Sequence, residues 1–243
     1  MSENSTLEAP TRETQIRDAS IPDAAIGEGP SGEIPIKIDL KLFATDESSV
    51  EAEELISVFH RWIQTGPVDD LLIDVADYSH VPEGPGVILV AHDAQYQFDL
   101  GQGRPGLLYS RRRETHPSLQ GLTGLEGRLV SVLRAALTAG RKLESESSLA
   151  GRLRFRGDEM LLRLNDRLRA PATDQTEAVV RPALEALLER LYPGTGFRVE
   201  REGDPRDPFT LRIRSERSVP VAMLLARLGD PGVRPVSPDP ASL

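Results

Sequence analysis

The sequence contains no cysteine. This absence excludes disulfide bonds, thiolate catalysis and metal centres held by cysteine. Lysine is scarce too, because only three of the 29 basic residues are lysines. No apolar run approaches the roughly 20 residues that a membrane-spanning helix needs. The composition therefore predicts a soluble protein without disulfides, in which arginine supplies most of the positive charge.

Acidic residues outnumber basic ones, and the formal net charge is -9. An acidic chain is a poor partner for nucleic acid, because phosphates attract basic surfaces. The N-terminus also lacks the basic segment and apolar core of a signal peptide. We therefore expect a cytoplasmic protein that binds neither nucleic acid nor membranes.

Two terminal segments have the composition of disordered chain. Residues 1–32 are polar and rich in Gly and Pro, with six acidic residues against two arginines. Such a segment buries too little apolar surface to offset the entropy lost on ordering. Prolines in residues 230–243 oppose both helix and sheet. We expect both tails to be disordered, and removal of residues 1–32 to leave the fold intact.

The first lobe is predicted to span residues 33–145. Strict alternation over 34–42 predicts a half-buried strand. Helical spacing follows, with Ser48 and Glu51 placed as a capping box and Gly66 as the C-cap glycine. Trp62 falls on the apolar stripe of this helix and is predicted to be a core residue.

Short alternating segments then predict a further strand and a meander of three strands. They are residues 71–78, 86–92, 96–100 and 106–112. A long helix is predicted from Thr123, with Glu126 in its first turn.

The second lobe is predicted to span residues 146–229, after a polar boundary. It reads as a hairpin turning near Gly157 and Asp158, then a helix with Asp174 and Glu177 in capping positions, a second hairpin and a short helix. The predicted order is strand–strand–helix, twice. Antiparallel hairpins with helices packed on one face predict an α+β fold.

All four histidines lie between residues 60 and 116, close in sequence to several aspartates. Histidine and carboxylate groups together can ligate a metal or transfer protons. No HxH, HExxH or HxxxH spacing occurs, so we favour a structural role for these residues and expect no cofactor and no bound metal. A catalytic or metal site is the alternative. The cluster comprises His60, Asp74, Asp77, His80, His92 and Asp93.

The stretch from His92 to Arg113 carries a second candidate. Its "GQGRPG" does not lead into a helix, so it predicts a tight turn and not a phosphate-binding loop. Arg111 and Arg113 are predicted to share one strand face after Tyr109, where they could grip a carboxylate or phosphate, or blunt a sheet edge. The candidate contacts for an anion or a protein partner are Arg104, Tyr109, Arg111 and Arg113.

Arginines alternate with apolar residues through the second lobe, as at Arg212 and Arg214. This pattern predicts a sheet face lined with arginine, and acids such as Glu200 can pair with them across strands. The aromatic residues there are in phase with the buried face and not available for base stacking. We therefore expect a solvated or protein-facing sheet.

Three segments carry a resemblance: "VFHRWIQ", "LLIDVADYSHVPEGPGVILVAHDAQY" and "GRPGLLYSRRR". Over about residues 34–113 the chain resembles a widespread, uncharacterised family of bacterial proteins. The resemblance implies no activity, but it points to the first lobe as the functional half.

Two functions follow as expectations. The first is a non-catalytic cytoplasmic module that binds another protein, in assembly or regulation. The alternative is a small-ligand or metal-dependent enzyme that uses the His, Asp and Arg cluster of the first lobe.

Overall fold

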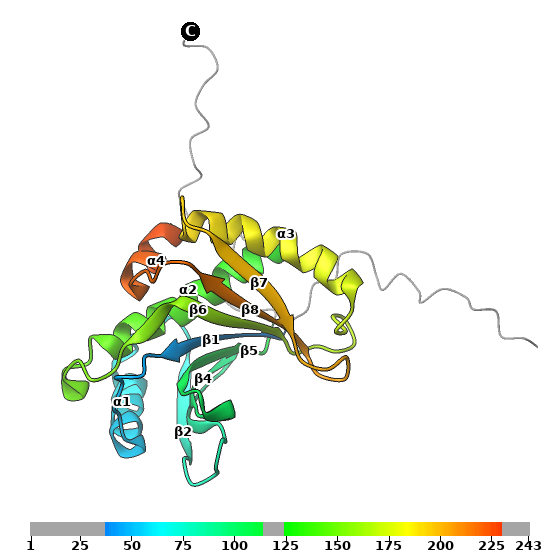
Figure 1. The fold of residues 1–243 in the computed structure, drawn as a ribbon. Coiled ribbons are helices and arrows are strands. Elements are labelled where there is room, and N and C mark those ends of the chain that lie inside the picture. Colours follow the sequence, from blue (N-terminus) through cyan, green and yellow to red (C-terminus); the bar gives the residue numbers. More distant parts are fainter. Residues whose placement is uncertain (1–36, 114–123, 230–243) are drawn as a thin grey trace, which may run out of the picture. The chain divides into compact units, whose positions relative to one another are not determined.

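A computed structural model describes residues 37–113 and 124–229 of the chain. The predicted tails, Thr123 and His116 lie outside the described residues. Within them the fold is an eight-stranded antiparallel sheet with four α-helices (Figure 1). The predicted α+β class is confirmed.

The sheet has the strand order β2-β3-β4-β5-β1-β6-β8-β7. The strands predicted for the two lobes join in this single sheet, because β1 pairs with both β5 and β6. The predicted meander is confirmed as β3, β4 and β5. The strands are β1 (Ile38–Ala44), β2 (Leu72–Tyr78), β3 (Gly86–Ala91), β4 (Ala94–Asp99), β5 (Gly106–Arg111), β6 (Phe155–Leu164), β7 (Phe197–Glu202) and β8 (Phe209–Ser215).

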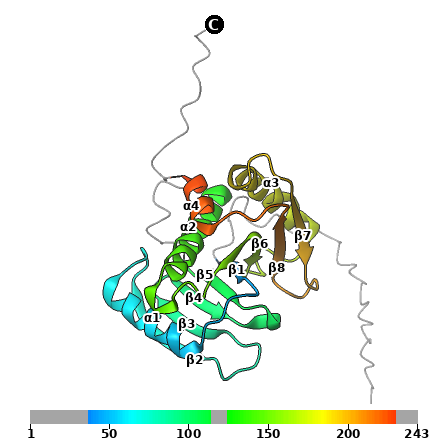
Figure 2. The same ribbon diagram turned by 60° about the vertical axis from the view of Figure 1, so that its left-hand side comes forward.

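The helices pack on one face of the sheet (Figures 1 and 2). α1 contacts β2 and β3, α2 contacts β1 and β5, and α4 contacts β6, while α3 packs on α2 and α4. Their apolar sides and the facing strand residues form one core. The helices are α1 (Ala52–Thr65), α2 (Gly124–Glu144), α3 (Asp174–Leu191) and α4 (Val221–Leu228).

The central strand β1 is buried on both faces, and not half-buried as predicted. Ile38, Leu40 and Leu42 face the helices and are fully buried. Asp39 and Lys41 point to the other face and are buried as well. Side chains from neighbouring strands contact them there: Asp99 pairs with Lys41, and Ser110 hydrogen-bonds to Asp39. We call the face opposite the helices the open face; its central residues are Asp39, Lys41, Phe43, Glu159, Leu161 and Arg212.

Helix α1 begins three residues later than its predicted capping box. Glu51 is the N-cap, and Glu51 and Glu54 form a reciprocal capping box. The Ser48 hydroxyl instead donates to the backbone carbonyl of Arg154, the residue before β6, and so connects the two loops. Gly66 is confirmed as a left-handed C-cap, and Trp62 is confirmed as a core residue.

The predicted hairpin at Gly157 and Asp158 is wrong, since β6 is one strand of ten residues. Gly157 is needed there for close packing: a Cβ atom on it would lie 1.7 Å from the Val219 carbonyl oxygen. The Tyr192 hydroxyl also donates to the Gly157 carbonyl oxygen at 2.9 Å. The predicted second lobe therefore consists of strand β6, helix α3, the β7–β8 hairpin and helix α4, in that order.

The start of α3 also differs from the predicted capping. Thr173 is its N-cap, and the Thr173 hydroxyl accepts from the Thr176 N–H at 3.3 Å. Asp174 and Glu177 lie in the first turn, where carboxylates interact favourably with the helix dipole. Pro182 lies inside the helix and does not end it.

Candidate functional site

The candidate residues between His92 and Arg113 fall into three different environments. Tyr109 and Arg111 lie on β5 beneath α2, Arg104 lies in the loop between β4 and β5, and Arg113 follows the end of β5. The structure therefore does not gather these four residues into one site.

Arg111 is inside the protein, with 2% of its surface exposed. It donates to the Ser131 hydroxyl on α2 and to the Tyr109 hydroxyl at 3.1 Å. The Tyr109 ring lies 5.0 Å from that of Tyr96, whose hydroxyl donates to the Asp70 carboxylate. Burial raises the pKa of both phenols, which keeps them protonated as donors. These hydrogen bonds connect α2, through Ser131, and the loop before β2, through Asp70, to strands β4 and β5 of the sheet.

Arg113 meets His92 and Asp93 at the surface. His92 Nδ1 lies 2.8 Å from the Asp93 carboxylate, and a guanidinium nitrogen of Arg113 lies 3.3 Å from His92 Nε2. His92 and Arg113 are exposed. Exposed pairs of this kind contribute little free energy, so the trio is an ordinary surface contact between the β3–β4 turn and the end of β5.

The other members of the histidine and aspartate cluster are also exposed. His60 lies on α1, Asp74 and Asp77 lie on β2, and His80 stacks on Tyr78 in the following turn. Within residues 37–113 and 124–229, no group of three or more His, Asp or Glu side chains could hold a metal ion.

Arg104 belongs to a charge network on the open face that the sequence analysis did not identify. Its guanidinium pairs with both carboxylate oxygens of Glu159, at 2.9 and 2.6 Å, and stacks 4.0 Å above the Phe43 ring. Arg212 pairs with Glu159 at 2.8 Å.

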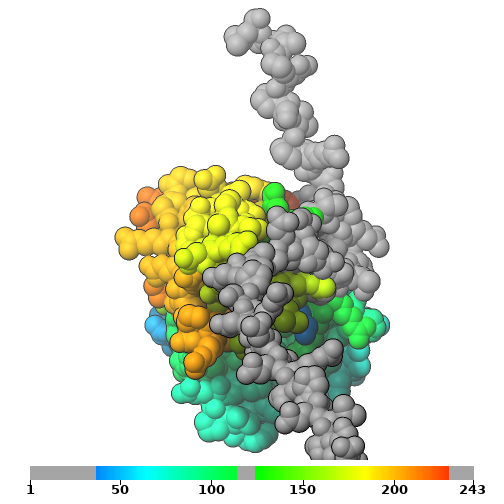
Figure 3. Space-filling model, turned by 90° about the vertical axis from the view of Figure 1, so that its right-hand side faces the viewer, coloured from blue at the N-terminus to red at the C-terminus, as the bar shows by residue number. Residues whose placement is uncertain are grey.

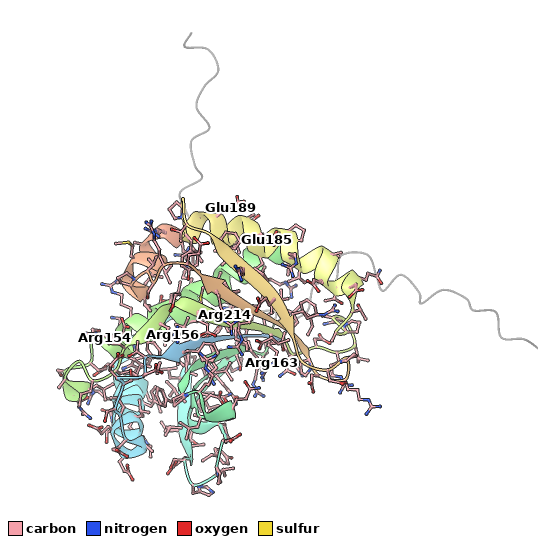
Figure 4. All side chains as sticks on the ribbon, viewed as in Figure 1. Arg154, Arg156, Arg163, Glu185, Glu189 and Arg214 are labelled. Atoms are coloured by element: carbon pink, nitrogen blue, oxygen red, sulfur yellow. The ribbon has the colours of Figure 1, made fainter. Side chains whose placement is uncertain are left out.

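Arg214 and Arg156 lie further out, at 3.4 and 3.7 Å from the same carboxylate. Figure 4 labels these two arginines. We call Glu159 and its four arginines the Glu159 network.

The Glu159 network is balanced in charge. Arg156 also pairs with Asp158, Arg212 with Glu202 and Arg214 with Glu200, the last a cross-strand pair that the sequence analysis anticipated. Hydrogen bonds from Arg104 and Arg212 hold the pKa of Glu159 at about 2. Its arginines are therefore engaged within the sheet and offer no free cation to an anionic ligand.

A pocket of about 340 Å³ opens beside Arg104. Phe43, Phe98 and Leu100 give it apolar walls, and Thr45 and Ser48 lie at its polar side. A smaller pocket, about 140 Å³, lies across the β4–β5 loop next to Lys41 and Arg163. Lys41 pairs with Asp99, and burial lowers its pKa.

The most distinctive surface lies at the edge strand β2. Seven large hydrophobic residues are exposed in the described part of the chain, and four of them fall between residues 71 and 81. Their exposed fractions are 70% for Leu71, 53% for Ile73, 44% for Tyr78 and 37% for Val81. These four residues are the β2 edge patch.

The strand at the opposite edge of the sheet, β7, carries several charged side chains. β7 carries Arg198, Glu200, Arg201 and Glu202, and Arg201 pairs with Asp174 of α3 at 2.8 Å. Charged side chains on an edge strand discourage pairing with other chains. In Figure 3 the yellow and orange residues of α3 and β7 lie above the cyan region that contains β2. Among the described residues, the β2 edge carries exposed large apolar side chains and the β7 edge does not.

The sequence around β2 has an unusual charge composition. From Trp62 to Gly103 the chain contains no Lys and no Arg, yet seven acidic residues. Four of those acids form no ion pair with any residue in the described ranges: Asp69, Asp74, Asp77 and Glu83. The β2 edge patch is thus apolar and flanked by carboxylates that form no ion pair within the described residues.

Comparison with known proteins adds no further information: no protein-family model and no curated protein matches the chain. None of the helices in the described ranges has the length and apolar character to span a membrane.

Proposed function

We propose that this protein is a non-catalytic module that binds another protein through the β2 edge patch. The single observation that carries the proposal is that Leu71, Ile73, Tyr78 and Val81 are exposed on or directly beside the edge strand β2. Contiguous exposed apolar surface is characteristic of protein–protein interaction sites. Edge strands additionally offer backbone groups to an incoming strand.

The distribution of polar residues supports binding over catalysis. His60, His80 and His92 are exposed and each has a different neighbourhood, while Arg104 and Arg212 of the open face are paired with carboxylates. A catalytic site needs acid, base or nucleophile groups that converge on one point. The β2 edge patch needs no such convergence, because its apolar side chains bind by contact.

The test compares two variants in affinity capture from the source cell. Ile73→Lys places a charge in the β2 edge patch, and Val179→Lys makes the same change at an exposed valine of α3. We expect the wild-type protein and Val179→Lys to retain the same partner, and Ile73→Lys to lose it. Equal retention by all three proteins would contradict the proposal.

A second candidate function is small-ligand binding in the pocket beside Arg104, which the pocket's volume and apolar walls support. Ligand-observed NMR with a fragment library tests this function. Hits that Leu100→Trp abolishes, with the fold retained, would support it; an absence of such hits would remove it.

A further inference from the structure

The charge around the β2 edge patch restricts the class of partner. Asp74 and Asp77 lie on β2 itself, Asp69 precedes it, and Glu83 lies in the turn after it. Their carboxylates have no cationic partner in the described ranges. Charge complementarity favours partners of opposite sign and accelerates their association.

A second copy of this chain is a poor occupant of the same surface. A two-fold pairing is self-complementary, so it would place β2 against β2. Asp74 and Asp77 of both copies would then approach one another, and like charges on paired strands are destabilising. The acids thus act against self-association while leaving the edge open to a basic chain.

The geometry of β2 specifies the length and pattern of the partner segment. β2 has seven residues, which corresponds to about 23 Å at the rise of an extended strand. A segment of similar length that adds to this edge presents alternate residues to one side. Asp74 and Asp77 are three residues apart on β2 and lie on opposite sides of the strand. Basic residues on one side of the segment can therefore pair with Asp74, while its apolar residues on the other side can contact Ile73. A further basic residue beside the segment can reach Asp77.

We infer that the β2 edge patch binds an extended, positively charged protein segment in which apolar and basic residues alternate. This inference rests on the proposed function and adds the chemical class of the partner. It commits to strand addition at β2, with lysine or arginine of the partner paired to the acids that flank the patch.

The experiment uses the full chain and three labelled seven-residue peptides that match β2 in length. They alternate valine with lysine, with serine or with glutamate, and their binding is followed by fluorescence anisotropy at low and high salt. We expect the lysine peptide to bind at least about tenfold more tightly than the glutamate peptide, and added salt to reduce this difference.

Two double variants distinguish binding of the lysine peptide to the acids at β2 from its attraction to the net negative charge of the whole protein. Asp74→Asn with Asp77→Asn removes charge at the patch, whereas Glu185→Gln with Glu189→Gln removes the same charge on α3 (Figure 4). The first should weaken lysine-peptide binding about tenfold, and the second should leave it unchanged. Equal effects of both would mean attraction to the acidic chain as a whole and would overturn the inference.

The remaining outcomes distinguish this inference from the proposed function. Preferential binding of the serine or glutamate peptide, abolished by Ile73→Lys, would overturn the basic class while supporting the β2 edge patch as the docking surface. Binding of none of the peptides would overturn strand addition by a basic segment. A concentration-dependent dimer that Ile73→Lys abolishes would make a second copy the occupant instead.

Discussion

Glu159 illustrates how one carboxylate can organise a buried surface. It is 4% exposed, and Arg104 and Arg212 both donate to it while Arg156 and Arg214 lie within 4 Å. Removing one partner of a buried charge network leaves the others desolvated without compensation, which costs more than the loss of an exposed pair. The stability of the open face should therefore depend strongly on this single residue.

Glu159→Gln should lower the free energy of unfolding at neutral pH by about 3 kcal/mol, since the network holds the Glu159 pKa near 2 against an ordinary value of 4.5. A carboxylate with a lowered native pKa stabilises the fold above its unfolded pKa. That contribution is lost as pH falls from 4.5 toward 2. The wild type and the variant should thus converge in stability over this range.

Urea unfolding of both proteins across the pH series measures this convergence. Glu200→Gln is the matched control, because Glu200 is exposed and Arg214 is its one ion-pair partner within residues 37–113 and 124–229. A constant stability difference at every pH, or an equal loss in the control, would contradict the role assigned to Glu159.

Trp62 is a second residue with a measurable contribution. It is 1% exposed, its ring lies 5.7 Å from that of Phe59, and its indole N–H donates to Glu146 at 2.7 Å. Trp62→Ala should cost about 3–5 kcal/mol, as other large-to-small core changes do. Trp62→Phe retains most of the packing and should cost less. Thermal unfolding compares the two, and equal losses would mean that packing of the ring is not the dominant contribution.

At the scale of elements, β6 owes its unbroken course to Gly157. A Cβ atom there would overlap the Val219 carbonyl carbon and oxygen, which belong to the segment before α4. Gly157→Ala should destabilise the protein by about 3 kcal/mol, the upper range for overpacking. Gly194→Ala is a useful comparison, since a Cβ atom there would meet no residue other than its chain neighbours within 4 Å, whereas its φ is +66°. Its cost should be about 1 kcal/mol, from backbone strain alone.

Chemical denaturation gives both values. A Gly157→Ala protein as stable as Gly194→Ala would show that the Val219 segment yields easily to the added methyl group.

Much of this architecture could be predicted from the sequence, because periodicity records which side of an element is buried. The meander, the α1 stripe around Trp62 and the left-handed Gly66 are examples. Gly157 was misread because a glycine required by long-range packing has the same local signature as a turn glycine. Ser48 was misread because its hydroxyl bonds to Arg154, 106 residues away.

The candidate site was harder to predict for the same physical reason. Strand order decides which residues meet, and the pairing of β1 with β6 brings Arg104 to Glu159 across 55 residues of sequence. Local spacing cannot encode such a contact. The acidic stretch between Trp62 and Gly103, by contrast, is visible in the sequence. Its relevance to binding depends on the strand order, which places β2 at the edge of the sheet.

At the scale of the whole described fold, charge is distributed unequally along the sheet. The β6, β7 and β8 end carries paired arginines and glutamates, whereas the β2 end carries acids and exposed apolar residues. A sheet with one guarded edge and one accessible edge has a defined direction for strand addition. This asymmetry is the basis of the proposed function and of the proposed partner class.

Hydrogen exchange of the backbone amides tests the central claim most directly. The protein is measured alone and in complex with the partner retained in affinity capture. Strand addition at β2 predicts slower exchange in Leu72–Tyr78 on binding, with no change in Phe197–Glu202 of β7. Protection confined to β7 or α3, with β2 exchanging as in the free protein, would contradict the claim.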